Sequence, residues 1–497
     1  MNRVAGSKVS AVVGMVLGLA LAGQAGAVHV NPRGTGQVLL YPYYTVNKDQ
    51  QTYVTLVNTT ENAKVAQVSF REGRNSRTVL DFKVFLSPFD VWAGTVFALE
   101  DVAGEGGEGA AVLTSDRSCT SPSFWTGGHG MINGSPYARF TSSSFADDGG
   151  PQGSARTREG HIEIVALADL TGSLADAVTH RNGVPVDCAR VANLNAPTPE
   201  MVAPGGGLLG SGAVINVGQG TYFSFRADAL DDFTSRTLIT GLDVPVDPLC
   251  EVNDAGSTNA TARVFTGDGI VEARYGGDTP NLRIDAVSAV LMADTLHNDY
   301  LVEPAIGASS DWVITFPTKR FYTDPFAGAG DGPAALPPFV ELFDEGASCV
   351  QTQITYYDRE EMTAATGGFP GIPPAPLRPQ LCYGANVLTF GTDTSPDASA
   401  VLGSRLVAVG FGLDPAFKAG WARLGLDPDA EPHALRPSLA LGGAGSSGKV
   451  FHGLPAIGFW TVNLVNNNVA DGVMSNYSAA VPHTTRVTCT AGESGCR

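Results

Sequence analysis

Charged residues, and basic residues in particular, are scarce in this chain. Only 16% of its 497 residues are charged, and 31 lysines and arginines stand against 49 aspartates and glutamates, which gives a net charge of −18. Proteins that bind nucleic acid need clustered lysine and arginine to replace the counterions of phosphates, so the acidic balance argues against such a partner. The 43% of hydrophobic residues is too high for a disordered chain, and no Gly-X-Y period indicates collagen.

The chain also lacks the motifs of common hydrolases and nucleotide-binding enzymes. It has no G-x-S-x-G nucleophile elbow and no H-E-x-x-H zinc motif. Residues 205–210 match G-x-G-x-x-G, but Pro204 precedes them and a β-branched segment follows, whereas a dinucleotide site needs a strand before and a helix after. Residues 443–449 resemble a phosphate-binding loop, but Val450 stands where a serine or threonine must bind magnesium. We therefore expect loops at both segments, and we predict a non-enzymatic protein without catalytic, cofactor-binding or metal-ligating residues.

Clustered carboxylates leave two chemical alternatives open. The clusters are Asp147 with Asp148, Asp231 with Asp232, and Asp358 with Glu360 and Glu361. Such oxygen-rich groups suit calcium, although no EF-hand loop is present. Two carboxylates across a cleft could instead hydrolyse a glycosidic bond. The favoured interpretation is that all of them are solvated acids in surface loops.

The first segment has the three parts of an export signal. Arg3 and Lys8 supply a positive start, residues 9–21 are almost all apolar or small, and residues 25–27 fit a small-residue cleavage site. The apolar run is too short for a membrane-spanning helix, and no later stretch is apolar for long enough. We predict a signal peptide over residues 1–27, no transmembrane span, and a mature net charge of −20, since two basic residues are removed. The expected location is the cell surface or the extracellular space, with the periplasm as the alternative.

Cysteine usage agrees with export. All seven cysteines follow the predicted signal, and disulfides persist in oxidising compartments. No C-x-x-C occurs, and the spacings do not match structural zinc patterns. The expected disulfides are Cys119 with Cys188, Cys349 with Cys382, and Cys489 with Cys496. The second would close a Pro-rich excursion at residues 369–379, and the odd count leaves Cys250 unpaired.

Short apolar segments predict a fold that is mainly β. Within residues 78–86 the side chains of Leu80, Phe82, Val84 and Leu86 occupy alternate positions, which is the period of a half-buried strand. Further strands are expected at residues 37–44, 53–57, 65–70, 91–99, 161–167, 213–217, 221–226, 312–316, 354–357, 386–390, 405–411, 456–465 and 484–489. Residues 285–296 predict a helix with Asp285 as its N-cap, and residues 174–179 and 187–193 are weaker candidates, so one or two short helices are expected.

The spacing of the strands also predicts a domain organisation. Five strands within residues 28–103 are typical of an immunoglobulin-like β-sandwich. A Gly- and Glu-rich link begins a β-rich middle region with short helices at residues 104–300, and a C-terminal β-rich region follows at residues 301–497. The length of the mature chain likewise favours two or three domains.

Aromatic residues are placed in several of these predicted strands. They are Tyr41, Tyr43, Tyr44, Trp92, Trp312, Phe316, Phe321 and Tyr322. Exposed aromatic rings could stack on sugars, whereas buried ones would form the core between sheets. The core is the favoured interpretation.

Four stretches together carry a family resemblance. They are LYPYY at residues 40–44, LSPFDVW at 86–92, DWVITFPTKR at 311–320 and GLPAIGF at 453–459. With them, the chain resembles an uncharacterised family of exported cell-surface or secreted proteins of Gram-negative bacteria. The resemblance spans most of the mature chain and implies a surface or secreted location, but it brings no catalytic residues.

These observations predict a secreted or cell-surface structural protein that interacts with copies of itself, with other surface proteins or with polysaccharide. Exposed strand edges can accept a strand of another chain. Residues 28–44 are the candidate for such strand addition, and the alternative is that they form an ordinary first strand of their own domain. The rival function is an extracellular glycan-binding protein or glycoside-active enzyme, which a row of exposed aromatics or a cleft with facing carboxylates would favour.

Overall fold

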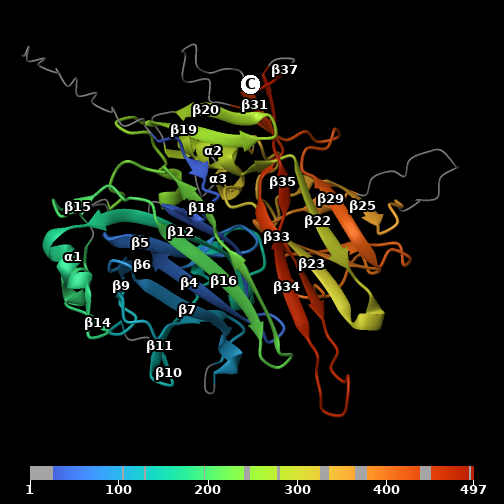
Figure 1. Ribbon diagram of the computed structural model, residues 1–497, viewed down its shortest axis with the longest axis horizontal. Coiled ribbons are helices and arrows are strands. Elements are labelled where there is room, and N and C mark those ends of the chain that lie inside the picture. Colours follow the sequence, from blue (N-terminus) through green and yellow to red (C-terminus); the bar gives the residue numbers. More distant parts are fainter. Residues whose placement is uncertain are drawn as a thin grey trace, which may run out of the picture.

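The chain is mainly β with few helices, as its sequence predicts (Figure 1). The structure, a computed structural model, describes residues 26–102, 106–127, 130–194, 196–239, 247–276, 280–324, 335–363, 378–436, 449–491 and 494–496. The predicted signal peptide up to residue 25, most of the Pro-rich excursion and the phosphate-loop-like segment up to residue 448 lie outside these residues.

Two large sheets form the N-terminal part. The first has the order β1-β18-β3-β12-β5-β6-β9, with β15 paired to β12, and its strands are His29–Val30, Asp228–Asp231, Val38–Thr45, Glu159–Leu170, Ala63–Glu72, Thr78–Leu86, Cys119–Ser121 and Met201–Val202. The second has the order β10-β11-β8-β7-β4-β16-β17, with β2 paired to β16, and its strands are Gly130–Ile132, Ser135–Arg139, Ala110–Leu113, Val91–Ala98, Gln51–Asn58, Leu208–Asn216, Thr221–Arg226 and Thr35–Gly36.

Alternating side chains from both sheets meet in one core, so the two sheets form a sandwich. In β6, Phe82, Val84 and Leu86 are buried at alternate positions and pack in the same cluster as Trp92 of β7 and Val214 of β16. All eight aromatic residues that the sequence placed in strands or beside them are buried, as the favoured interpretation predicted. The period of two therefore identified the inward face correctly.

The sandwich extends far beyond residues 28–103. Strand β12 lies between β3 and β5 and pairs with both, and β16 and β17 extend the second sheet. The strands of residues 28–98 thus share their sheets with strands up to residue 231. The pattern of neighbouring residues could not predict this extension of the sandwich. Strand β12, which lies between β3 and β5, is about 90 residues further along the chain.

Three smaller sheets form the C-terminal part. The first, which carries the candidate site and is called the site sheet, has the order β25-β29-β22-β35. Its strands are Gln353–Asp358, Ala419–Gly425, Thr295–Leu301 and Thr484–Arg486. A five-stranded sheet has the order β28-β27-β23-β33-β34, with strands Ala408–Gly412, Ala385–Gly391, Ala308–Thr315, Ile457–Leu464 and Tyr477–Pro482. The end sheet has the order β30-β31-β36-β37, with strands Ala434–Leu435, Lys449–His452, Thr488–Ala491 and Ser494–Gly495.

Strand pairs and short helices complete the described fold. The pairs are β13 (His180–Arg181) with β14 (Val184–Pro185), β19 (Asn259–Thr266) with β20 (Gly269–Gly276), β21 (Met292–Ala293) with β32 (Leu454–Pro455), and β24 (Val350–Gln351) with β26 (Gln380–Leu381). The α-helices are α1 (Gly172–Val178), α2 (Pro280–Leu291) and α3 (Arg320–Thr323). Single 3-10 turns lie at Leu99–Asp101, Ser143–Phe145, Ser154–Arg158, Cys188–Arg190, Pro248–Cys250 and Pro304–Ile306.

The helix expected at residues 285–296 is displaced towards the N-terminus. It ends at Leu291, because Met292 and Ala293 pair with β32 and β22 begins at Thr295. Asp285 lies inside α2 and accepts a hydrogen bond from the Tyr322 hydroxyl at 2.7 Å, so it is not the N-cap. The expected helix at residues 187–193 is only the 3-10 turn Cys188–Arg190, whose N-cap is Asp187.

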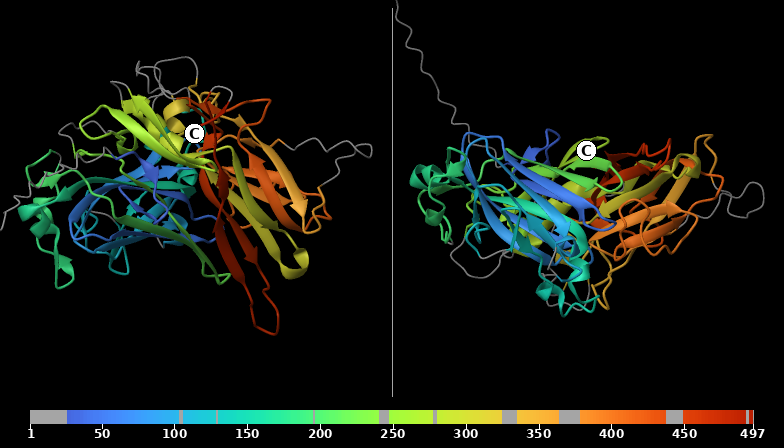
Figure 2. Two further views of the ribbon diagram at one scale, coloured as in Figure 1. Left: turned by 45° about the horizontal axis from the view of Figure 1, so that its top comes forward. Right: turned by 90° about the horizontal axis from the view of Figure 1, so that it is seen from below.

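The N- and C-terminal parts pack against each other (Figure 2). A buried ion network joins them: Glu163 of β12 accepts hydrogen bonds from Arg71 of β5 and from Arg320 of α3, each with a shortest distance of 2.6 Å. Asp247 lies 2.8 Å from both guanidinium groups. Because the network links α3 to the first sheet, it fixes how the two parts are placed.

Candidate functional site

The exposed side of the site sheet carries a polar and aromatic surface, which we call the outer face. Alternate side chains of its strands, such as Ile354, Tyr356, Leu424 and Leu296, are buried in the core. The side chains between them point outwards because of the period of two. The outer face is formed by Gln353, Thr355, Tyr357, Trp421, Arg423, Thr295, His297, Asp299, Thr484 and Arg486.

Three rings lie in a row across the outer face. Trp421 of β29 is directly opposite Tyr357 of β25, and their rings stack with centroids 4.6 Å apart and an interplanar angle of 14°. The ring of His297 on β22 lies 6.2 Å from the other side of Trp421, tilted by 33°. Trp421 is 40% exposed. The neighbouring rings hold the indole in place and leave part of it open to a ligand.

A cavity of about 380 Å³ continues from the outer face towards the end sheet. Arg423 follows Trp421 by two residues and lines this cavity, so the aromatic row and the cavity share one continuous surface. The lining residues are Asp294, Thr295, Gln353, Thr355, Arg423, Gly425, Asp427, Pro428, His452, Arg486, Thr488 and Thr490. Donors and acceptors therefore surround the space, and the described residues that line it include no large apolar side chain.

The carboxylate of Asp294 is fully engaged on one side of the cavity. Arg486 Nε lies 3.1 Å and 3.0 Å from its two oxygens, and the hydroxyl of Thr488 also donates to it. These hydrogen bonds and the negative charge of Asp294 raise the pKa of Arg486, so the guanidinium remains charged. Asp294 thus holds a cation at the mouth of the cavity.

A second carboxylate and a histidine lie on the other side. Asp427 Oδ2 is 3.1 Å from Nδ1 of His452, and Nε2 of the same ring is 2.9 Å from the Thr490 hydroxyl. Both ring nitrogens are therefore occupied, which fixes the orientation of His452. Asp427 also accepts a hydrogen bond at 2.6 Å from the backbone N–H of His433, which ties the site to β30.

Two further groups, Arg423 and His297, complete the chemistry of the outer face. Arg423 is exposed, and its side chain makes no hydrogen bond or ion pair in the part of the chain that the structure describes. Burial, together with the charges of Arg423 and Arg486, lowers the pKa of His297, so its ring is neutral at pH 7. The surface therefore offers one unpaired cation beside flat, uncharged rings.

No pattern in the sequence predicted this site. Its residues come from five separate stretches between residues 294 and 490, and no motif links them. The one local signal was in Ala419–Gly425, where Trp421 and Arg423 alternate with Ala422 and Leu424. That alternation predicts a strand with a polar, aromatic outward face, and it was missed.

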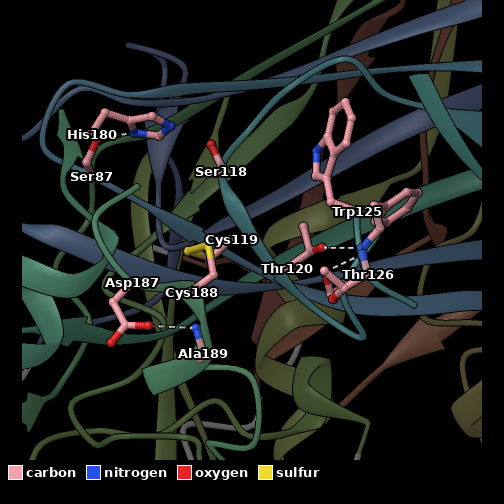
Figure 3. Close-up of a disulfide and its surroundings, with 12 residues drawn as sticks. Ser87, Ser118, Cys119, Thr120, Trp125, Thr126, His180, Asp187, Cys188 and Ala189 are labelled. Carbon is pink, nitrogen blue, oxygen red and sulfur yellow. Dashed lines mark hydrogen bonds between the residues drawn. A yellow bond between two sulfur atoms is a disulfide. The ribbon is translucent and has the colours of Figure 1, made fainter. Parts of the chain in front are cut away.

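The three disulfides have the pairing expected from the sequence. Cys119 of β9 bonds Cys188, which begins the 3-10 turn capped by Asp187 (Figure 3). Cys349 bonds Cys382 beside the β24–β26 pair, and Cys489 bonds Cys496 in the end sheet. Cys250 is a free, buried thiol that donates to the Asp247 carbonyl at 3.0 Å.

The acidic clusters that the sequence singled out are not brought together. Asp148 is buried and bonds Arg156, so it is a structural ion-pair residue and not a solvated acid. Asp147, Asp232, Glu360 and Glu361 are exposed. Within the described ranges, no group of three or more His, Cys, Asp or Glu side chains is placed to hold a metal ion.

The segment proposed for strand addition is an interior strand. Strand β3 pairs with β12 on one edge and with β18 on the other, and all eight of its residues are buried. At the start of the segment, β1 pairs with β18 and Val28 forms a bridge to Ala262. The segment therefore has the role of an ordinary strand of its own sandwich.

Comparisons with known proteins give no relative: no family model, no curated protein and no solved structure matches the chain. Among the described helices, none has both the length and the apolar character to cross a membrane. Any functional assignment must therefore come from the site itself.

Proposed function

We propose that this chain is an exported, non-enzymatic interaction protein that binds polysaccharide on the outer face of the site sheet. The observation that carries the proposal is the stacked row Tyr357–Trp421–His297, which continues into the polar cavity next to Arg423. The eight aromatics considered at the sequence level are buried, whereas this row contains the exposed Trp421.

The chemistry of the surface suits a hydroxyl-rich ligand. The flat faces of sugar rings carry C–H groups that pack on aromatic rings, and their hydroxyls need both donors and acceptors. Gln353 and Thr355 of β25 and Thr295 of β22 supply such groups on the two sides of β29. An extended sugar chain could thus lie across the strands, with one residue over Trp421 and the next at the cavity.

Export is proposed on two supports. One is the signal peptide predicted for residues 1–27, and the other is the set of three disulfides, which are stable outside the cytoplasm. The proposed location is the cell surface or the extracellular space, with the periplasm as the alternative, and the resemblance to exported proteins of Gram-negative bacteria favours the same location.

The test is binding of the mature protein to defined polysaccharides. Sedimentation with insoluble cellulose and chitin, and affinity electrophoresis in gels containing dextran or alginate, compare neutral and acidic sugars. Binding to at least one of them, together with quenching or enhancement of tryptophan fluorescence, is the expected result. If the protein binds none of these polymers, polysaccharide recognition at this face is rejected.

A second candidate is glycoside hydrolysis, because Asp294 and Asp427 line the same cavity. Both carboxylates already have charged or ring partners, Arg486 and His452, which favours binding over proton transfer. Reducing ends released from a bound polysaccharide would identify an enzyme. Loss of that release in Asp427→Asn, with binding retained, would assign the activity to the cavity.

A further inference from the structure

A fully buried lysine lies against a buried aspartate inside the N-terminal sandwich. Lys64 of β5 is 0% exposed and Asp169 of β12 is 4% exposed, and Lys64 Nζ is 2.7 Å from Asp169 Oδ1. Lysine is almost never fully buried unless it is paired. The arrangement therefore brings an amine and a carboxyl group into contact where water is excluded.

A β-bulge creates this contact. Ile162, Ile164 and Ala166 of β12 point into the inter-sheet core, and simple alternation would turn Asp169 to the opposite side. The register between β12 and β5 shifts between Ala166 and Ala168, after which Asp169 is directly opposite Lys64. One extra residue thus places Asp169 on the inward face, beside a lysine that shares this face with the core residue Ala66.

Two neighbours hold the pair in a defined geometry. The side-chain amide of Asn62 donates to Asp169 Oδ2 at 3.1 Å, and Lys64 Nζ donates to the Gly205 carbonyl at 3.2 Å. The backbone of Gly205 also lies close over the pair, since a Cβ built there would be 3.2 Å from Asp169 Oδ2. The two reacting groups are thus fixed, and an amide donor is aimed at the second carboxylate oxygen.

We infer that Lys64 and Asp169 form an intramolecular amide cross-link between β5 and β12. The ammonium group passes one proton to Oδ1, which leaves a neutral amine and a carboxylic acid. Nζ then attacks Cγ, and the charge that develops on Oδ2 is stabilised by the Asn62 amide. The Nζ–Cγ bond forms, the Cγ–Oδ1 bond breaks, and Oδ1 departs as water with its proton and a second proton from Nζ.

Physical reasons favour this reaction at this position. Holding the two groups in contact raises their effective concentration to roughly 10⁵ M or more. The carboxylic acid then needs no prior activation, which a reaction between free molecules would require. A buried ion pair carries a desolvation cost, whereas the amide product is neutral. The inference is independent of polysaccharide binding, because the pair lies in the other part of the molecule.

Other lysines in the described chain lack either full burial or a carboxylate partner. Lys418 pairs with Glu303 at 3.3 Å, but its side chain is about half exposed at 52%. Lys319 is buried, but its Nζ donates to the Ser348 carbonyl, which is not a carboxyl group. Lys418 therefore provides the matched control for an ordinary ion pair.

Intact-mass measurement of the mature, fully reduced and denatured protein tests the cross-link. The expected mass lies one water molecule below the mass calculated from the observed N-terminus, and protease digestion yields a branched peptide that contains both Lys64 and Asp169. A mass equal to the calculated value overturns the inference, and this result needs no variant.

Variants then assign the bond. Lys64→Met and Asp169→Ala should restore the calculated mass, while Lys418→Met should keep the loss of water. Asp169→Asn should lose ammonia instead of water and reach the same final mass as the cross-linked wild type. If the loss of water persists in Asp169→Ala, the modification lies elsewhere and the assignment to this pair is wrong.

Discussion

The indole of Trp421 stacks on the phenol ring of Tyr357, with their centroids 4.6 Å apart and their planes within 14° of each other. The two residues are directly opposite on adjacent strands β29 and β25. Cross-strand aromatic pairs stabilise a sheet, but Trp421 remains 40% exposed, beside an arginine whose side chain has no protein partner among the described residues. This relationship distinguishes the outer face from the buried aromatic cores.

Trp421→Ala should weaken polysaccharide binding about tenfold, which corresponds to about 1.4 kcal/mol. The reason is the loss of the ring on which a sugar would stack. Affinity electrophoresis measures the change. Tyr222→Ala is the control, since Tyr222 is 57% exposed on β17, outside the outer face. Equal loss of binding in both variants would show that the outer face is not the site.

Glu163→Gln should destabilise the fold by about 3–5 kcal/mol, because two buried arginines would lose their shared carboxylate. Chemical denaturation at pH 7 measures the free energy of unfolding. Burial by itself would raise the pKa of Glu163, but the charges of Arg320 and Arg71 outweigh it and lower the pKa.

The same residue should make stability depend on pH in acid. A carboxyl group whose pKa is lower in the folded than in the unfolded chain contributes stability above the unfolded pKa of about 4.3, and this stability is lost as the pH falls below it. The wild type should therefore lose more stability than Glu163→Gln between about pH 5 and pH 3. Parallel stability curves for the two proteins would contradict the assigned ion network.

Replacing Cys119 and Cys188 together by serine should cost about 4 kcal/mol in the free energy of unfolding. The disulfide closes a loop with a sequence separation of 69 residues, and the loss of its constraint on the unfolded chain sets this magnitude. Urea titration checks it. The Cys489–Cys496 disulfide spans only 7 residues, so its removal should cost clearly less.

Cys250 should be unreactive in the folded protein. Burial first, and the nearby charges of Asp247 and Glu251 second, raise its pKa to about 12, so almost no thiolate exists at pH 8. Labelling with a thiol reagent without reductant should modify no cysteine in the native state and one per chain in denaturant. Fast labelling of the native protein would place Cys250 at the surface.

Deletion of residues 28–44 should prevent folding, because β3 lies between β12 and β18 and is buried throughout. Circular dichroism and size exclusion measure the outcome. A folded monomer obtained only after the deletion would support the strand-exchange hypothesis instead.

The sequence was most informative where neighbouring residues decide the structure. The alternation of Phe82, Val84 and Leu86 predicted β6 and its buried face, and the strands predicted at residues 213–217 and 221–226 correspond to the end of β16 and to β17. The cysteine count and order predicted one unpaired cysteine, and the structure leaves Cys250 free. These features depend on side-chain period or on simple counting, so no distant contact is needed to predict them.

The tertiary structure decided which strands are neighbours and which side chains meet. Strand β12 lies between β3 and β5, and a bulge after Ala166 turns Asp169 towards Lys64. Tyr357, Trp421 and His297 come from strands far apart in the chain and form one row only when β25, β29 and β22 pair. The sequence alone determined an acidic, β-rich chain with cysteines suited to disulfides. Both candidate sites depend on long-range strand pairing, whose register comes from packing of the whole core and not from any local pattern.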